Sequence, residues 1–111
     1  MNESYLLVLS TCPEGAPAQQ LAQFLVEEHL AACVNILPGL TSVYAWEGSI
    51  ETGRESLLLI KTEHQVYPAL EARLRERHPY ELPEIIAVPI QLGLNDYLHW
   101  INQWLIPRSM P

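Results

Sequence analysis

Residues 33–62 read CVNILPGLTSVYAWEGSIETGRESLLLIKT, and this stretch decides the fold. Two runs with strand character, 33–46 and 49–62, flank a Glu-Gly pair at 47–48 that suits a hairpin turn. A Pro-Gly pair at 38–39 interrupts the first run, and a proline inside a strand indicates an edge position or a bulge. The stretch therefore predicts a long hairpin whose first strand lies at an edge or carries a bulge.

A strand and a helix precede this hairpin. Residues 5–9 form a continuous apolar run of strand length, which is typical of a central strand covered on both faces. From Pro17 to about Ala32, small and apolar residues recur at helical spacing, and a proline suits the first turn of a helix. We therefore expect a helix over residues 17–32.

A second helix follows the hairpin. Thr62 and Gln65 fit a capping box, and the helix predicted over residues 66–78 should end before Pro79, because the residue before a proline resists helical geometry. The rest of the chain predicts, in order, a loop (80–83), a strand (84–90), a helix capped by Asn95 or Asp96 that continues to Leu105, and an irregular tail (107–111).

The order of these segments is βαββαβ followed by a final helix. This split βαβ pattern is the signature of an α+β, ferredoxin-like fold. Right-handed crossovers give the strand order 4-1-3-2 in an antiparallel sheet, with the apolar run at 5–9 in a central position. The chain has 111 residues and shows no repeat or linker, so we expect a single domain over residues 1–111.

The two hairpin strands are too long for the helices that cover the sheet. Thirteen strand residues span roughly 43 Å at about 3.3 Å each, whereas a helix of about 15 residues spans roughly 23 Å. The tip would then expose Val43, Tyr44, Trp46 and Ile50. An apolar ribbon with open edges favours pairing with another chain. A hairpin curled onto its own domain is the alternative.

The composition indicates a globular protein and disfavours nucleic-acid binding. Thirteen acidic residues against six basic ones give a net charge of −7, which repels phosphate backbones. The apolar run at 5–9 is too short for a signal-peptide core or a membrane span. Two cysteines do not make a disulfide framework. We therefore expect a cytoplasmic protein with reduced thiols that binds no membrane.

Several short motifs together resemble the CutA divalent-cation tolerance family. The resemblance runs from about residue 5 to residue 105, in order and at family spacing. It rests on residues 11–13 (TCP), 30–35 (LAACVN), 38–44 (PGLTSVY), 46–48 (WEG), 59–62 (LIKT), 78–84 (HPYELPE) and 96–98 (DYL). It implies a ferredoxin-like fold, a PII-like homotrimer in which long hairpins pair between subunits, and a role in tolerance to divalent metals, especially copper.

The candidate metal ligands are Cys12 and His78. The first strand and the second helix run in the same direction, so topology brings both residues to the same end of the molecule. Thiolate and imidazole are good ligands for copper and zinc, so the candidate cofactor is Cu(II) or another divalent cation.

The resemblance implies a copper site at this end, which some relatives build from a cysteine and two histidines. Here Ser10 and Arg77 take two of those three positions, and only His78 is retained. Cys12 lies on the same strand face as Ser10 and could substitute for the missing cysteine. Alternatively, His78 anchors the end of the helix and Cys12 fills the core. Cys33 lies at the opposite end of the sheet, so no Cys12–Cys33 disulfide is expected.

The resemblance also implies a cleft between subunits. The positions that line it in the family correspond here to Tyr44, Trp46, Glu51, Lys61, Tyr80 and Glu81. These residues could hold a small ligand or an ion. They could instead form a plain subunit interface, in which aromatic residues are common and Lys61 would pair with a carboxylate.

The sequence therefore leaves two functions open. One is a homotrimer that acts in metal tolerance and binds metal weakly. The other is a PII-like signalling or scaffolding trimer that binds a small molecule or a partner protein in the cleft. No metal-binding His or Cys pair, glycine-rich phosphate loop or Gly-x-Ser-x-Gly elbow is present, so the sequence predicts no enzyme.

Overall fold

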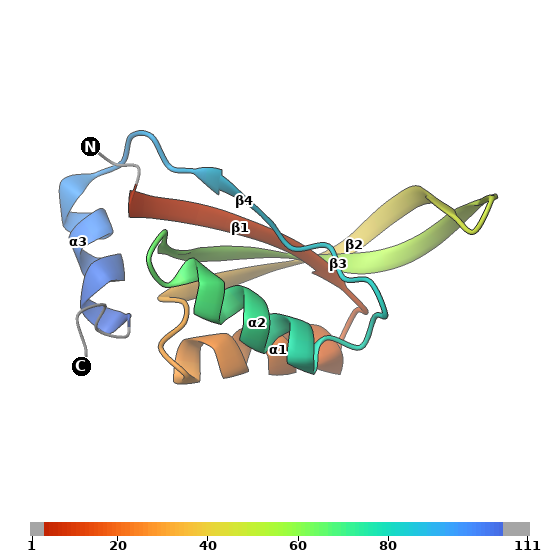
Figure 1. Cartoon of the computed structure of the whole chain (residues 1–111), viewed down its shortest axis with the longest axis horizontal. Coiled ribbons are helices and arrows are strands. Elements are labelled where there is room, and N and C mark those ends of the chain that lie inside the picture. The colour runs from red at the N-terminus through yellow and green to blue at the C-terminus, as the bar shows by residue number, and fades with distance from the viewer. Residues whose placement is uncertain (1–3, 106–111) are drawn as a thin grey trace.

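The computed structural model describes residues 4–105. In chain order its elements are β1 (Tyr5–Cys12), α1 (Ala16–Glu27), β2 (Cys33–Trp46), β3 (Ser49–Glu63), α2 (Tyr67–Arg77), β4 (Ile86–Pro89) and α3 (Asn95–Trp104). Figure 1 shows α1 and α2 on the same side of the sheet, the β2–β3 hairpin projecting at one end and α3 at the other. The ferredoxin-like βαββαβ order with an additional C-terminal helix is confirmed.

The four strands form one antiparallel sheet in the order β2-β3-β1-β4, as the crossover argument predicted. β1 lies between β3 and β4, in agreement with its apolar sequence, and β2 is an edge strand. Cys12 pairs with Ser56 of β3, whereas Cys33 pairs with Lys61 further along the same strand. The two cysteines therefore lie apart along the sheet, and both are free, as the sequence predicted.

The β2–β3 hairpin is longer than the helices that flank it. β2 has 14 residues and β3 has 15, against 12 in α1 and 11 in α2. The register shifts between Leu37 and Leu40, so the bulge predicted at the Pro-Gly pair is confirmed. At the turn, Gly48 has a φ of 83°, which glycine adopts without strain. The apolar tip is exposed, as predicted, at Val43, Tyr44, Trp46 and Ile50.

The core lies between the sheet and the two helices. Successive strand residues face opposite sides, and the even-numbered residues of β1 and of the part of β3 from Ser56 to Thr62 are buried on the side of α1 and α2. The largest apolar side chains with almost no exposed surface are Val8, Leu25, Leu58, Ile60, Val66, Leu70, Leu74 and Ile101. Burial of each stabilises the fold by roughly 1.5–3 kcal/mol.

The other face of the sheet is also apolar, but α1 and α2 do not cover it (Figure 1). Leu7 pairs with Val88 and Leu9 with Ile86, and the two β4 residues are 43% and 52% exposed. An apolar sheet face of this kind marks an interaction surface. We call this surface the open face and define it as Leu7, Leu9, Leu57, Leu59, Ile86 and Val88.

α1 ends at Glu27, five residues before the predicted end near Ala32. His29 has a left-handed φ of 59°, and the Leu30 N–H donates to the Leu25 carbonyl at 3.0 Å. The chain therefore turns toward β2 while the apolar periodicity still continues. That periodicity reflects burial of the turn and not additional helix.

The capping box predicted at Thr62 is wrong. Thr62 is buried within β3, and its hydroxyl donates to the Leu30 carbonyl at 2.8 Å. α2 begins at Tyr67, with Val66 as its N-cap and no side-chain cap. Strand pairing and a tertiary hydrogen bond therefore hold the threonine that the local pattern assigned to the helix.

The start of α3 differs from the prediction as well. Asn95 and Asp96 lie inside its first turn, and Leu94 occupies the N-cap position without a side-chain hydrogen bond. β4 covers 86–89, which is shorter than the predicted strand over 84–90. The irregular tail expected at 107–111 lies outside the described residues.

Candidate functional site

His78 closes the C-terminal end of α2 and ties it to the end of β1. Its backbone N–H donates to the Leu74 carbonyl at 2.9 Å. Its ring nitrogen Nε2 lies 2.8 Å from the Thr11 carbonyl oxygen, and the Tyr80 N–H donates to Nδ1 at 3.1 Å. A carbonyl can only accept, so Nε2 carries the proton and Nδ1 is the acceptor. Both nitrogens of the neutral ring are therefore engaged.

The electrostatics of this end favour uncharged groups. Burial lowers the pKa of His78, and the hydrogen bond to Thr11 and the nearby Glu55 carboxylate oppose that shift only in part. Burial, together with the negative charge of Glu55, raises the pKa of Cys12 to about 11. At neutral pH the imidazole and the thiol are therefore both neutral, as burial dictates.

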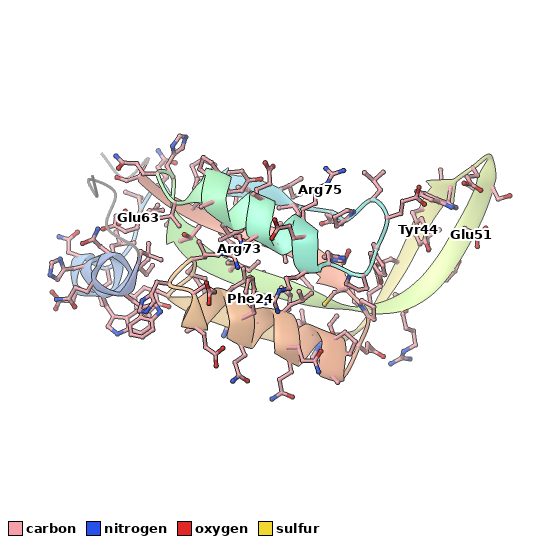
Figure 2. All side chains as sticks on the ribbon, turned by 60° about the horizontal axis from the view of Figure 1, so that its bottom comes forward. Phe24, Tyr44, Glu51, Glu63, Arg73 and Arg75 are labelled. Carbon is pink, nitrogen blue, oxygen red and sulfur yellow. The ribbon has the colours of Figure 1, made fainter. Side chains whose placement is uncertain are left out.

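The two positions at which the resemblance implied further ligands have other surroundings. Ser10 is buried, and its hydroxyl has no hydrogen-bond partner within residues 4–105. The Arg77 guanidinium lies over the Phe24 ring, 4.0 Å from its centroid. Arg73 approaches the same ring at 5.2 Å, and Figure 2 shows Phe24 and Arg73 where α1 and α2 meet.

These residues do not fit a tight metal centre in the single chain. Cys12 and His78 reach the same end, as topology predicted, since His78 bonds the residue next to Cys12. A tight copper or zinc site needs three or four free ligands, and residues 4–105 contain no cluster of three metal-ligating side chains. Weak metal binding by Cys12 and His78 stays a prediction.

A groove of about 710 Å³ lies between the outer part of the hairpin, residues 42–46 of β2, and the loop that follows α2. The hairpin contributes Tyr44 and Trp46, and the loop contributes Tyr80 and Glu81. Glu55 of β3 also lines the groove, and the Tyr80 hydroxyl donates to its carboxylate at 2.7 Å. Thr11 at the end of β1 also lines the groove, which is therefore built from four segments of the chain.

Four of the six predicted cleft residues line this groove, and two do not. Glu51 pairs with Tyr44 across the hairpin, and Figure 2 places both beyond the helices. Lys61 lies toward the other end of β3, where its ammonium contacts the Asn35 amide oxygen and lies 3.9 Å from the Cys33 sulfur. In the single chain, Lys61 is therefore paired with an amide and not with a carboxylate.

Sequence reasoning did not select Glu55 and Glu84, which also line the groove. Burial and the Glu55 carboxylate raise the pKa of Tyr80, so its hydroxyl remains a hydrogen-bond donor at neutral pH. Glu84 belongs to the motif at 78–84 and could have been chosen from it. Glu55 offered no local signal, because its partner lies 25 residues away.

The comparisons with known proteins agree with this architecture. A family model described as CutA1 divalent ion tolerance protein matches residues 6–104. The Divalent-cation tolerance protein CutA of Thermus thermophilus is 48% identical over 87% of this chain and 94% of its own length. Mouse Protein CutA is 47% identical over 84% of this chain, which spans only about half (52%) of that longer protein.

Solved structures give the same result. The crystal structure of CutA from Xylella fastidiosa has a TM-score of 0.90 and 48% identity, over 93% of this chain and 99% of that one. A protein of Archaeoglobus fulgidus, described as periplasmic, has a TM-score of 0.87 and 35% identity, over 90% of this chain and 97% of its own. The names describe cation tolerance and no enzymatic reaction. The chain belongs to the CutA1 divalent ion tolerance protein family.

Proposed function

We propose that this chain works as a homotrimer in the tolerance of divalent cations, copper in particular, and catalyses no reaction. The observation that carries the proposal is the open face, an apolar sheet surface that α1 and α2 leave uncovered. Leu37 on the edge strand extends this surface and is 52% exposed. Contiguous apolar surface of this kind is rare on monomers and is normally buried against a partner.

The hairpin supports the same assembly. β2 is an edge strand, so one side of its backbone has no strand partner among residues 4–105. Ile50 and Val43 near the tip are 76% and 66% exposed. Unpaired strand edges with apolar side chains favour pairing with another copy. Three copies that pair in this way would cover both the edge and the open face.

Metal contact in this proposal is weak and occurs at Cys12 and His78. A Cu(II) ion could use His78 only after the imidazole releases either Thr11 or Tyr80, and the Cys12 thiol would have to lose a proton that burial retains. Each requirement lowers the apparent affinity. The expected cofactor occupancy is therefore low, and tolerance would depend on the assembly more than on a tight metal centre.

A growth assay tests the proposed role. Cells that lack their own family member would receive the wild-type gene, a Val88→Glu variant or a Gln19→Glu control, and would grow on a series of copper concentrations. Val88 lies on the open face, whereas Gln19 is exposed on α1. Wild type and Gln19→Glu should restore growth, and Val88→Glu should not. If cells without any family member grow on copper as well as cells with the wild-type gene, the proposed role is wrong.

Calorimetric titration with Cu(II) tests the metal contact separately. His78→Ala should weaken binding at least tenfold, whereas His99→Ala, exposed on α3, should leave it unchanged. Unchanged binding in His78→Ala would remove this end of the molecule from the proposal.

The groove favours a second candidate function, a PII-like signalling or scaffolding trimer that binds a small ligand or a partner protein. Its volume of about 710 Å³ falls in the range of small-molecule sites, about 300–1,000 Å³. A thermal-shift series with small molecules would test it. Absence of a shift with every ligand would count against this candidate.

The proposed compartment is the cytoplasm. The two free cysteines support it, because unpaired thiols persist in reducing surroundings. No helix within residues 4–105 is both long and apolar enough to cross a bilayer. Fractionation of cells that express the protein would test the location, and recovery in a periplasmic or secreted fraction would refute it.

A further inference from the structure

We propose that the groove binds a linear aliphatic polyamine, a flexible organic cation with ammonium groups separated by methylene chains. The inference rests on the second candidate function, for which it names the ligand class. The charge, the spread of the acidic groups and the apolar walls of the groove each support this choice.

The charge of the groove selects a cation. Three carboxylates line it, Glu55, Glu81 and Glu84, and none of its lining residues is a lysine, arginine or histidine. The chain as a whole carries a net charge of −7. The charged residues in this lining would repel a nucleotide or another phosphate ligand and attract a cation. The groove therefore lacks the positively charged side chains that an anion site needs.

The spread of the carboxylates selects an extended cation and not a metal ion. Glu55 comes from β3 and is held by the Tyr80 hydroxyl at 2.7 Å, while Glu81 and Glu84 come from the loop before β4. Residues 4–105 contain no cluster of three metal-ligating groups, so these carboxylates do not converge on one point. Ammonium groups spaced along a chain can reach separate carboxylates, which a single ion cannot do.

The walls of the groove suit methylene chains. Tyr44, Trp46 and Tyr80 supply three aromatic rings, and Leu82 adds an aliphatic side chain that is 67% exposed. Aromatic faces attract ammonium groups, and apolar walls cover the methylene segments between them. The volume of about 710 Å³ far exceeds that of one ion and accommodates a small flexible molecule.

Calorimetric titration of the full chain with spermidine tests the proposal. Wild type should bind one spermidine per chain, and Glu81→Gln/Glu84→Gln should bind it at least tenfold more weakly. Both glutamates are exposed, so the double variant should fold normally. The control is Glu27→Gln/Glu71→Gln, which removes the same charge from the outer faces of α1 and α2 and should bind like wild type.

A second variant tests the aromatic wall. Trp46→Leu keeps an apolar side chain and all three carboxylates, and it should weaken spermidine binding several-fold. Unchanged affinity would show that the Trp46 ring does not contact spermidine and would overturn the aromatic wall of the proposed site. ATP should show no saturable binding, and a site that prefers ATP or a lysine-rich peptide to spermidine would overturn the proposal.

Light scattering on the same samples separates this inference from the proposed trimer. A trimer without spermidine binding would refute the ligand and leave the assembly standing, for example if a sister chain fills the groove. A monomer that binds spermidine would refute the assembly and support the groove. Equal weakening in the Glu27→Gln/Glu71→Gln control would reveal nonspecific charge attraction and overturn the site.

Discussion

Replacement of His78 by alanine is expected to destabilise the chain through its two hydrogen bonds. The residue is 7% exposed, and its ring nitrogens serve Thr11 and Tyr80. A buried carbonyl left without its partner costs about 1–3 kcal/mol. Loss of the ring contact with Tyr80, at 4.9 Å between centroids, adds about 0.5–1.5 kcal/mol. The free energy of unfolding should therefore fall by about 1.5–4.5 kcal/mol.

Urea unfolding followed by tryptophan fluorescence measures this loss, at one chain concentration because assembly changes apparent stability. His78→Asn keeps an acceptor for the Tyr80 N–H and should lose about half as much. His99→Asn, exposed on α3, should change stability by less than about 0.5 kcal/mol. A His78→Ala variant as stable as wild type would refute the anchoring role of the imidazole.

The buried His78 also predicts that the stability of the fold depends on pH, and the same variants test this. Burial lowers the pKa of His78 in the folded chain below its ordinary value of 6.5, so the unfolded chain takes up the proton first on acidification. Its contribution to stability is complete above pH 6.5 and is lost as the pH falls toward the folded pKa. In a plot of the free energy of unfolding against pH, His78→Asn should lack the decrease below pH 6.5 that His78 causes, and His99→Asn should keep it. Identical plots for wild type and both variants would show that His78 is not the titrating group.

Three further predictions concern the core. Cys12, whose pKa burial raises to about 11, should resist iodoacetamide at pH 7.5 until the chain unfolds, as peptide mass spectrometry would show; rapid labelling of the folded protein would contradict its burial. Leu74→Ala should lower the free energy of unfolding by about 2–5 kcal/mol, measured in urea, because the side chain is fully buried; a loss under about 1 kcal/mol would refute close packing there. Ser56→Ala should leave stability unchanged or raise it by up to about 1 kcal/mol, since its buried hydroxyl has no hydrogen-bond partner in the described part of the chain, and a large loss in the same assay would contradict this.

Much of the fold follows from sequence because the decisive features are local or periodic. The length of the runs at 33–46 and 49–62, the Pro-Gly pair between them and the apolar run at 5–9 fix the hairpin, its bulge and the central strand. Two of the local errors, at the end of α1 and at the start of α2, share one cause. Thr62 and His29 have sequence neighbours that suit a helix, but tertiary hydrogen bonding and a left-handed turn determine their conformation.

The candidate site was less predictable because its geometry is tertiary. Topology alone brought Cys12 and His78 to the same end, but only the fold shows that both nitrogens of the imidazole are occupied. The bond between Tyr80 and Glu55 joins a loop to a strand, and no sequence spacing indicates it. Lys61 matched the family cleft by position, yet within one chain it lies away from the groove.

Sedimentation velocity on the wild-type protein at micromolar concentration tests the central claim most directly, with Val88→Glu and Gln19→Glu run beside it. Burial of the open face against sister chains predicts a wild-type species with three times the 12.6 kDa chain mass. Gln19→Glu should match wild type, and Val88→Glu should shift toward single chains because it places a charge on that face. A wild-type protein that sediments as a 12.6 kDa monomer would contradict the assembly.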